Sequence, residues 1–189
     1  MRIGIFGGTF DPPHVGHLIV ASDACAALEL DLLLLVPSAD PPHKQGRVEA
    51  TAEQRLELLR AATAGDPRFE VDDIELRRRG ASFTVDTLRE LRERHPDAEL
   101  FLLIGVDQMQ KLTSWREPHE VARLARLSVM TREGETPDPD SPFPHRLIPV
   151  TRIDLSSSDI RERIRAGQPV IYLLPDAVRE KVGEWGLYR

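Results

Sequence analysis

The sequence predicts an α/β protein whose core is a doubly wound, mostly parallel sheet. Two observations support this prediction. Segments with strand character alternate with segments of helical periodicity along most of the 189 residues. Two of the strand segments, "LLLLV" at 32–36 and "LFLLI" at 100–104, are apolar at every position. Such runs are typical of strands buried on both faces, as they are in parallel sheets.

The first third of the chain alternates between strands and helices. "RIGIF" is a short apolar run, and "VGHLIVASDACAALE" has apolar residues at helical spacing. "SADPPHKQGR" is rich in proline and polar residues, as loops are. In "TAEQRLELLRAATA", Thr51 and Gln54 have the spacing of a capping box at a helix start. We therefore expect strands at 2–6 and 30–37, helices at 15–29 and 51–64, and a loop at 38–47.

The remainder of the chain continues this alternation. "FEVDDIEL" alternates apolar and polar residues, as a half-buried strand does. Pro96 closes the helical stretch "TVDTLRELRERH", while a serine cap and a glycine stop bound "SSSDIRERIRAG". Four prolines and several acids mark 133–145 as an exposed loop. We expect strands at 69–76, 99–105, 127–132 and 146–150, and helices at 84–95, 119–127, 156–167 and 175–186.

Length and composition favour one globular domain over residues 1–189, with a small helical portion from about residue 155. The net charge of −6 argues against broad nonspecific binding of nucleic acid. The single cysteine, Cys25, cannot form an internal disulfide and fits among alanines as a small buried residue. No window of about 18 apolar residues occurs, and the first residues lack a signal-peptide pattern. We therefore expect a cytoplasmic protein without a membrane span.

Unusual polar residues concentrate in the loops that follow the predicted strands. Ligands of open parallel sheets bind beyond the carboxyl ends of the strands. We therefore expect one site formed by the loops 7–17, 38–46, 105–115, 131–134 and 154–158.

The first of these loops, "GGTFDPPHVGH", has the features of a phosphate site. Gly7 and Gly8 lack side chains where the first strand ends, so a ligand can approach the backbone closely. The start of the next helix offers free N–H groups and a positive dipole end. His14 and His17 share a helix face there and can donate to phosphate oxygens. A metal site and a pair of incidental surface histidines are the alternatives.

Several motifs carry a family resemblance. "GGTFDPPHVGH" resembles the signature of the nucleotidyltransferase superfamily built around an HxGH motif, and "LSSSDIR" at 155–161 is similar to its second motif, ISSTxIR. Leu155 and Ser158 replace the usual isoleucine and threonine and keep the same chemistry. "SFTVDTL", "GVDQMQKLTSW" and "TREG" narrow the resemblance to the bacterial nicotinate-nucleotide adenylyltransferase family, over nearly the whole chain.

The resemblance implies a Rossmann-like nucleotidyltransferase fold and one reaction. The family joins nicotinic acid mononucleotide to the AMP part of ATP, giving deamido-NAD and pyrophosphate in NAD biosynthesis, with Mg²⁺ accompanying ATP. Catalysis is then mostly positioning and charge neutralisation, without a covalent nucleophile. ATP and the mononucleotide are the expected partners, whereas nucleic acid and membranes are not. The apolar stretch "VIYLLPDAV" is compatible with a homo-oligomer.

The resemblance also implies residue roles, with His17 as the main transition-state residue and Trp115 stacking on the pyridine ring. The catalytic set is His17, His14, Lys44 and Arg161. The ATP-binding set is Gly7, Gly8, Thr9, Phe10, Gly105, Asp107, Ser156, Ser157 and Ser158. The set for the mononucleotide is Thr84, Val85, Trp115, Arg116 and Arg132. No residue is assigned as a metal ligand.

Plain structural alternatives remain for some of these residues. Lys44 could be a solvated loop lysine, Asp107 a helix N-cap, and Trp115 a core tryptophan. Arg132 could be a surface residue at a strand end. Three other functions also stay open: use of nicotinamide mononucleotide, a nucleotide-binding module without turnover, and phosphopantetheine or cytidylyl transfer.

Overall fold

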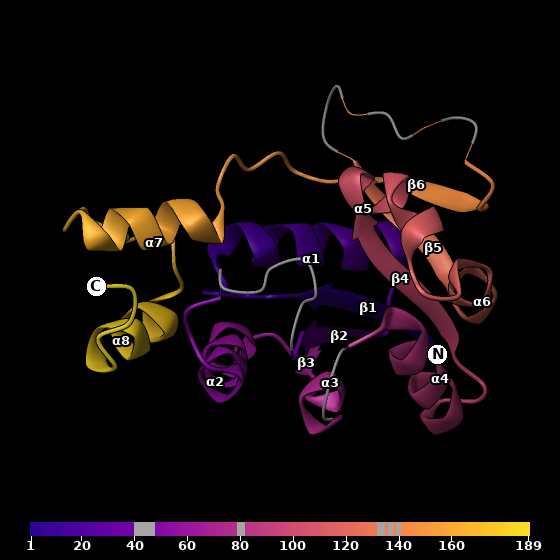
Figure 1. Cartoon of the computed structure of the whole chain (residues 1–189), viewed down its shortest axis with the longest axis horizontal. Coiled ribbons are helices and arrows are strands. Elements are labelled where there is room, and N and C mark those ends of the chain that lie inside the picture. The colour runs from indigo at the N-terminus through magenta and orange to yellow at the C-terminus, as the bar shows by residue number, and fades with distance from the viewer. Residues whose placement is uncertain (40–47, 79–81, 132–134, 136–137, 139–140) are drawn as a thin grey trace.

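Strands and helices alternate along the chain, as the sequence predicts (Figure 1). The computed structural model describes residues 1–39, 48–78, 82–131, 135, 138 and 141–189. The strands are β1 (Arg2–Gly8), β2 (Leu32–Pro37), β3 (Phe69–Val71), β4 (Glu99–Gly105), β5 (Arg126–Thr131) and β6 (His145–Pro149). The helices are α1 (Val15–Leu28), α2 (Ala52–Thr63), α3 (Ile74–Arg77), α4 (Thr84–Arg94), α5 (Val106–Gln110), the 3₁₀ turn η1 (Leu112–Ser114), α6 (Pro118–Leu124), α7 (Ser157–Arg165) and α8 (Asp176–Glu184).

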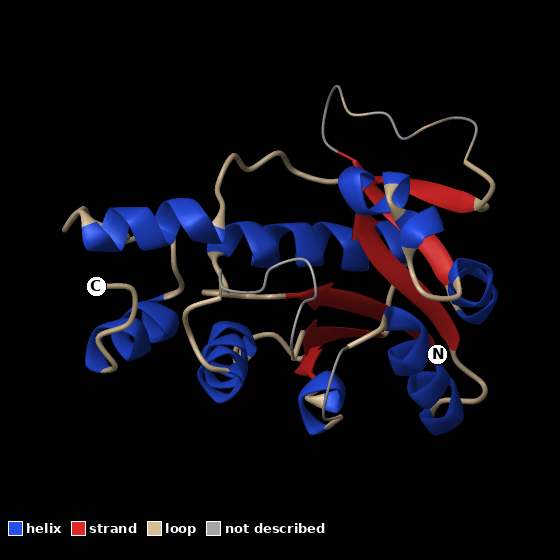
Figure 2. Cartoon of the chain, viewed as in Figure 1, coloured by secondary structure: helices blue, strands red, loops and turns tan. Residues whose placement is uncertain are grey.

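In the described part of the chain, six strands form one sheet in the order β3-β2-β1-β4-β5-β6 (Figure 2). Each neighbouring pair of these strands is parallel, so the predicted doubly wound sheet is confirmed. The chain first builds outward from β1 to β3 and then returns to the other side of β1 with β4. This reversal places the switch point between β1 and β4, whose carboxyl ends are the expected ligand position.

The two faces of the sheet pack against different helices, because successive side chains of a strand point in opposite directions. Leu33 of β2 packs with Cys25 of α1, which confirms the burial expected for that cysteine. Its neighbour Leu34 packs with Leu88 of α4 on the other face. Figure 1 shows α1 on one side of the strands and α2, α3 and α4 on the other. Because both faces are covered, β2 and β4 carry the unbroken apolar runs at 32–36 and 100–104.

The strand predicted at 69–76 is wrong beyond Val71, where β3 ends and α3 soon follows. The Asp72 carboxylate accepts a hydrogen bond from the Ile74 amide at 2.9 Å, which turns the chain. The alternating pattern of "FEVDDIEL" is that of a strand, but its two adjacent aspartates favour a turn and a helix start. The local hydrogen bonding of Asp72 therefore overrides the alternation.

Two other boundaries differ from expectation. The segment 105–115, expected as a loop, contains α5 and the turn η1, which ends before Trp115. The helix expected at 119–127 is shorter, because α6 ends at Leu124 and β5 begins at Arg126.

α7 and α8 pack beside α2, away from the centre of the sheet. Leu58 of α2, Ile160 of α7 and Val178 of α8 belong to one apolar cluster. The starts of α1 and α7 lie side by side (Figure 1), and Ser157 Oγ donates to the Pro12 carbonyl at 2.9 Å there. Within the described ranges, no helix combines the length and apolar character needed to cross a bilayer.

Candidate active site

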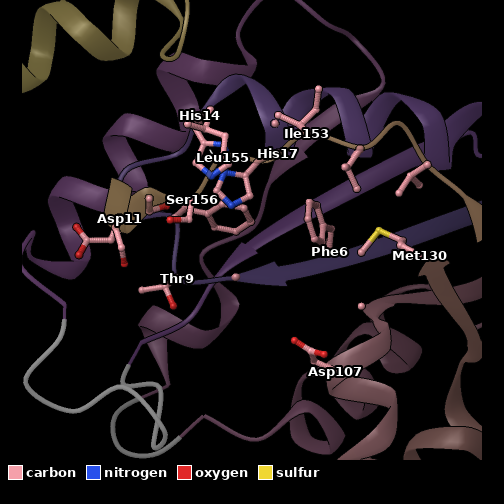
Figure 3. Close-up of a pocket in the computed structure, with 18 of the residues that line it drawn as sticks. Phe6, Thr9, Asp11, His14, His17, Asp107, Met130, Ile153, Leu155 and Ser156 are labelled. Carbon is pink, nitrogen blue, oxygen red and sulfur yellow. Dashed lines mark hydrogen bonds between the residues drawn. The ribbon is translucent and has the colours of Figure 1, made fainter. Parts of the chain in front are cut away.

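A cleft of about 700 Å³ opens at the carboxyl ends of β1 and β4 (Figure 3). Its size suits a small-molecule ligand. Three loops that were expected to meet, at 7–17, 105–115 and 154–158, all contribute to its walls. The predicted residues that line it are Gly8, Thr9, Phe10, His14, His17, Gly105, Asp107, Ser156, Ser157, Ser158 and Arg161. Lys44 and Arg132 lie outside the described residues.

His14 and His17 lie together at the cleft (Figure 3), with ring centroids 3.7 Å apart. The backbone N–H of His14 donates to Nδ1 of His17 at 3.1 Å. Since Nδ1 accepts this bond, the proton of the neutral His17 ring is on Nε2. His17 therefore carries an N–H donor on the side of its ring that faces away from the His14 amide.

Two glycines leave room for the rings packed around these histidines. A Cβ on Gly16 would lie 3.0 Å from Nδ1 of His14, a tighter approach than most real Cβ contacts. A Cβ on Gly8 would lie 2.8 Å from the ring of Phe10, and that ring packs edge-on against His17 with centroids 5.0 Å apart. Gly7 has open space around its Cβ position, so packing does not require a glycine there.

His14 is neutral in the folded protein at pH 7. Burial lowers its pKa to about 4, and the charge of Asp159 opposes this shift. Its side chain is buried, and within the described residues its Nδ1 has no hydrogen-bond partner. A buried polar atom of this kind usually receives a ligand or a water molecule.

We expect the free energy of unfolding to fall as the pH is lowered from about 6.5 to about 4. The unfolded chain protonates His14 near the ordinary pKa of 6.5, whereas the folded chain does so only near 4. This difference corresponds to about 3 kcal/mol over the interval. Urea unfolding at several pH values measures it. His14→Gln should remove this part of the pH dependence, whereas the control His119→Gln, at an exposed histidine, should keep it. If the free energy of unfolding of His14→Gln depended on pH in the same way as that of the wild type, the expectation would be contradicted.

Side chains from distant segments hold the turn between β1 and α1. Arg55 of α2 is almost fully buried and donates to the Thr9 carbonyl at 2.8 Å. From α7, Arg161 donates to the backbone carbonyl of Asp11 at 2.8 Å, and Ser157 donates to that of Pro12 at 2.9 Å. This role of Arg55 could not be predicted, because nothing in the sequence separates it from the other arginines on helices.

Asp11 is a buried carboxylate that was not among the predicted site residues. Its Oδ2 accepts the Glu49 amide at 2.8 Å, and its Oδ1 accepts the Ala50 amide at 3.1 Å. The hydroxyl of Tyr188 donates to the same Oδ1 at 2.8 Å. The position of Asp11 inside "GGTFDPPHVGH" was the one available signal, and Tyr188 had none.

The start of α7 offers backbone donors to the cleft. Ser156 is its N-cap, and the next two amides, of Ser157 and Ser158, have no acceptor among the described residues. Such amides and the helix dipole together favour an anion. The start of α1 is less open than expected, because the Val15 amide donates to the Leu173 carbonyl at 3.0 Å. The prediction of free amides is therefore wrong for Val15.

Arg161 brings a positive charge to the same end of the cleft. Its Nε donates to Glu49 Oε1 at 2.8 Å, and one terminal nitrogen lies 3.8 Å from Oδ2 of Asp11. Arg165 also hydrogen-bonds the Glu49 carboxylate. Arg165 foremost, and then Arg161, hold the pKa of the Glu49 carboxyl below its ordinary value.

Asp107 lies across the cleft from the two histidines (Figure 3). It is exposed in the first turn of α5, whose N-cap is Gly105, so the alternative of Asp107 as the N-cap is wrong. Open space surrounds the position of a Cβ on Gly105. A ligand can therefore approach the backbone at the end of β4 closely.

Thr84, Val85, Trp115 and Arg116 form a second group, around the start of α4. The Arg116 guanidinium lies 4.8 Å from the ring centroid of Phe83, which is the N-cap of α4. Val85 is fully buried, and Trp115 is half-buried against the same core cluster. None of the four lines the cleft that contains the histidines. Packing against the apolar core thus explains why part of the Trp115 ring is buried.

Comparisons with known proteins agree with the motifs. A family model described as cytidylyltransferase-like matches residues 5–163. A protein of Geobacillus thermodenitrificans, named probable nicotinate-nucleotide adenylyltransferase, is 43% identical over 99% of this chain and 86% of its own length. A protein of Shouchella clausii with the same name is 42% identical over 99% of this chain and 96% of its own length.

Solved structures share the fold at low sequence identity. The Plasmodium falciparum nicotinic acid mononucleotide adenylyltransferase complexed with NaAD has a TM-score of 0.83 and 18% identity, covering 99% of this chain and 97% of that chain. A putative nicotinate-nucleotide adenylyltransferase of Vibrio parahaemolyticus has a TM-score of 0.75 and 23% identity, covering 100% and 96%. With the full-length relatives at more than 40% identity, the chain belongs to the nicotinate-nucleotide adenylyltransferase family of nucleotidyltransferases.

Proposed function

We propose that this protein transfers the adenylyl group of ATP to nicotinic acid mononucleotide, giving deamido-NAD and pyrophosphate. The observation that carries the proposal is the meeting of two phosphate-binding elements at one cleft. One is the stacked pair of His14 and His17, and the other is the start of α7 with Arg161. The names of relatives that match nearly the whole chain support the same reaction.

The chemistry requires charge stabilisation at two places. A phosphate oxygen of the mononucleotide bonds to the α-phosphorus of ATP, while the bond from this phosphorus to pyrophosphate breaks. The Nε2–H of His17 donates to the α-phosphate as its charge increases. Arg161 and the amides of Ser157 and Ser158 bind the β- and γ-phosphates. Asp107 accepts hydrogen bonds from the adenosine ribose.

Other residues support this arrangement. Neutral His14 stacks on His17 and donates its backbone N–H to it, which fixes the orientation of the catalytic ring. Phe10 packs edge-on against the His17 ring and helps to keep that ring in place. Lys44 and Arg132 keep the phosphate-binding roles that the family resemblance gives them.

The nicotinate ring is proposed to bind at the start of α4 beside Trp115. There the Val85 amide and Thr84 donate to its carboxylate, and the nearest acid, Asp86, faces Arg116 at 3.7 Å. Nicotinamide would bring its own N–H group to these donors and leave them unpaired. We expect kcat/KM for nicotinic acid mononucleotide to exceed that for nicotinamide mononucleotide by about 10²-fold. Equal steady-state values for the two acceptors would contradict this.

Replacing Trp115 by alanine should raise the KM for the mononucleotide more than the KM for ATP, because the ring stacks on nicotinate. Steady-state kinetics with each substrate varied in turn gives the two constants. The chain has one other tryptophan, Trp185 after α8, and Trp185→Ala is the matched control. In a Trp185→Phe background, nicotinic acid mononucleotide should also quench the fluorescence of Trp115. A rise in the KM for ATP alone would remove Trp115 from the acceptor site.

The metal requirement of this reaction is proposed to be met by Mg²⁺ bound to ATP. Over the described ranges, no group of three or more histidine, cysteine, aspartate or glutamate side chains is placed to hold a metal ion. The described residues therefore supply no such ligand group, and no catalytic step is assigned to the ion. Mg²⁺ commonly keeps phosphate and water ligands, which suits this arrangement.

Pyrophosphate release tests the function directly. It should require both ATP and nicotinic acid mononucleotide, and deamido-NAD should form in equal amount. Nicotinamide mononucleotide, phosphopantetheine and CTP are the competing substrates in the same assay. ATP binding without pyrophosphate release from any acceptor would support a nucleotide-binding module instead.

A further inference from the structure

We propose that Tyr188 is a positioning residue for ATP binding: its hydroxyl, through the Asp11 carboxylate, holds Arg161 where it receives the β- and γ-phosphates. This inference rests on the proposed role of Arg161. Tyr188 does not line the cleft, so any effect on ATP must pass through the residues it contacts.

The contact between Tyr188 and Asp11 is buried on both sides. The Tyr188 hydroxyl donates to Oδ1 of Asp11 at 2.8 Å, and the two residues are 5% and 2% exposed. Burial and the negative charge of Asp11 raise the pKa of the Tyr188 hydroxyl above its ordinary value. The hydroxyl therefore remains a donor at every pH at which the protein works. A buried carboxylate of this kind is stable only while its donors are in place.

The same carboxylate is connected to Arg161 by two routes. Directly, a terminal nitrogen of Arg161 lies 3.8 Å from Oδ2 of the carboxylate, and the same nitrogen donates to the backbone carbonyl of Asp11 at 2.8 Å. Indirectly, Asp11 fixes the amides of Glu49 and Ala50, and the Glu49 side chain accepts from Nε of Arg161 at 2.8 Å. The guanidinium is thus held between two acids, both of which depend on the position of Asp11.

The backbone after α8 is shaped to bring Tyr188 to this point. Gly186 has a φ of +60°, and the Leu187 amide donates to the Val182 carbonyl at 3.0 Å, which reverses the chain. Tyr188 itself has a φ of +64°, a left-handed conformation that is unfavourable for a non-glycine residue. Contacts of the side chain must offset this cost, and its hydroxyl bond to Asp11 is the polar one among them.

Loss of the hydroxyl has a definite direction of effect. Without the Tyr188 hydroxyl, Oδ1 of Asp11 keeps only the Ala50 amide as a donor, and the guanidinium of Arg161, 3.8 Å from Oδ2, can supply the one that is lost. Arg161 is then drawn toward Asp11 and away from the phosphates of ATP. AMP lacks the β- and γ-phosphates, so its affinity should not change.

The test measures the affinities of ATP and AMP by calorimetry, with the full chain and no acceptor. Tyr188→Phe should weaken ATP binding by about 3- to 10-fold, the scale of one lost hydrogen bond, and leave AMP binding unchanged. Tyr172→Phe is the matched control, because Tyr172 is the only other tyrosine and is 83% exposed. The effect of Tyr188→Phe on ATP should disappear in an Arg161→Ala background, since the two residues act in series.

Three results would overturn the proposal: an unchanged ATP affinity in a folded Tyr188→Phe protein, an equal loss for ATP and AMP, or an undiminished effect in Arg161→Ala. If Tyr188→Phe does not fold, Tyr188→Met fills the same space without a hydroxyl and gives the same comparison. A lack of turnover with nicotinic acid mononucleotide would reject the proposed function alone. These binding measurements need no acceptor and would still decide the role of Tyr188.

Discussion

Replacing His17 by alanine is expected to lower kcat by about 10²–10³-fold, the scale of one lost transition-state donor. The ring is oriented by the His14 amide at 3.1 Å and by its contact with Phe10, so its Nε2–H is fixed before substrate arrives. The donor matters most when charge on the α-phosphate is greatest, and therefore the KM for ATP should change much less than kcat. Single-turnover pyrophosphate release at saturating substrates measures the step.

The matched control for this variant is His119→Ala, because His119 is exposed and lies away from the cleft. Both variants should unfold at nearly the wild-type urea concentration, which separates catalysis from folding. A near-wild-type kcat for His17→Ala would remove His17 from the mechanism.

Replacing Asp11 by alanine is expected to lower the free energy of unfolding by about 3–5 kcal/mol. The carboxylate accepts the amides of Glu49 and Ala50 and the hydroxyl of Tyr188, so its removal leaves several buried donors without an acceptor. Each such donor costs about 1–3 kcal/mol. Urea unfolding followed by circular dichroism gives the value.

Asp23→Ala is the control for the loss of a carboxylate that accepts a backbone amide. Asp23 accepts the Thr151 amide at 2.7 Å, but at an exposed position where water can replace it. Its loss should cost less than about 1 kcal/mol. If the two variants were equally stable, burial would not be what makes Asp11 important.

Much of the fold and the cleft follows from short-range features of the sequence. The apolar runs at 32–36 and 100–104 predict strands covered on both faces, and they are β2 and β4. The parallel sheet then places the loops after its strands at one edge, which is why "GGTFDPPHVGH" and "LSSSDIR" meet. Here local pattern and global topology agree.

The predictions fail where a polar group, in a side chain or in the backbone, turns the chain locally or bonds to a residue far away in the sequence. Asp72 turns the chain after three strand residues, although the apolar–polar pattern resumes from Asp73 to Leu76. The Val15 amide finds its acceptor at Leu173, a contact that no local pattern can reveal. Asp11 lies in a predicted motif, yet its partners could be named only after the chain was folded. The type of a buried polar residue predicts that it needs hydrogen-bond partners, but only the folded topology shows which residues those partners are.

The hydrogen bond between Asp11 and Tyr188 joins residues that are 177 positions apart. During synthesis, the turn that contains Asp11 leaves the ribosome long before the segment that follows α8. Its Oδ1 therefore lacks the Tyr188 donor until the last residues of the chain have folded, although the Glu49 and Ala50 amides can bind the carboxylate earlier. Contacts of such large sequence separation slow folding, because a long loop must close before they can form. The nucleotide cleft should thus mature last, as a slow kinetic phase that Tyr188→Phe alters while leaving the assembly of β1, β2 and β4 unchanged.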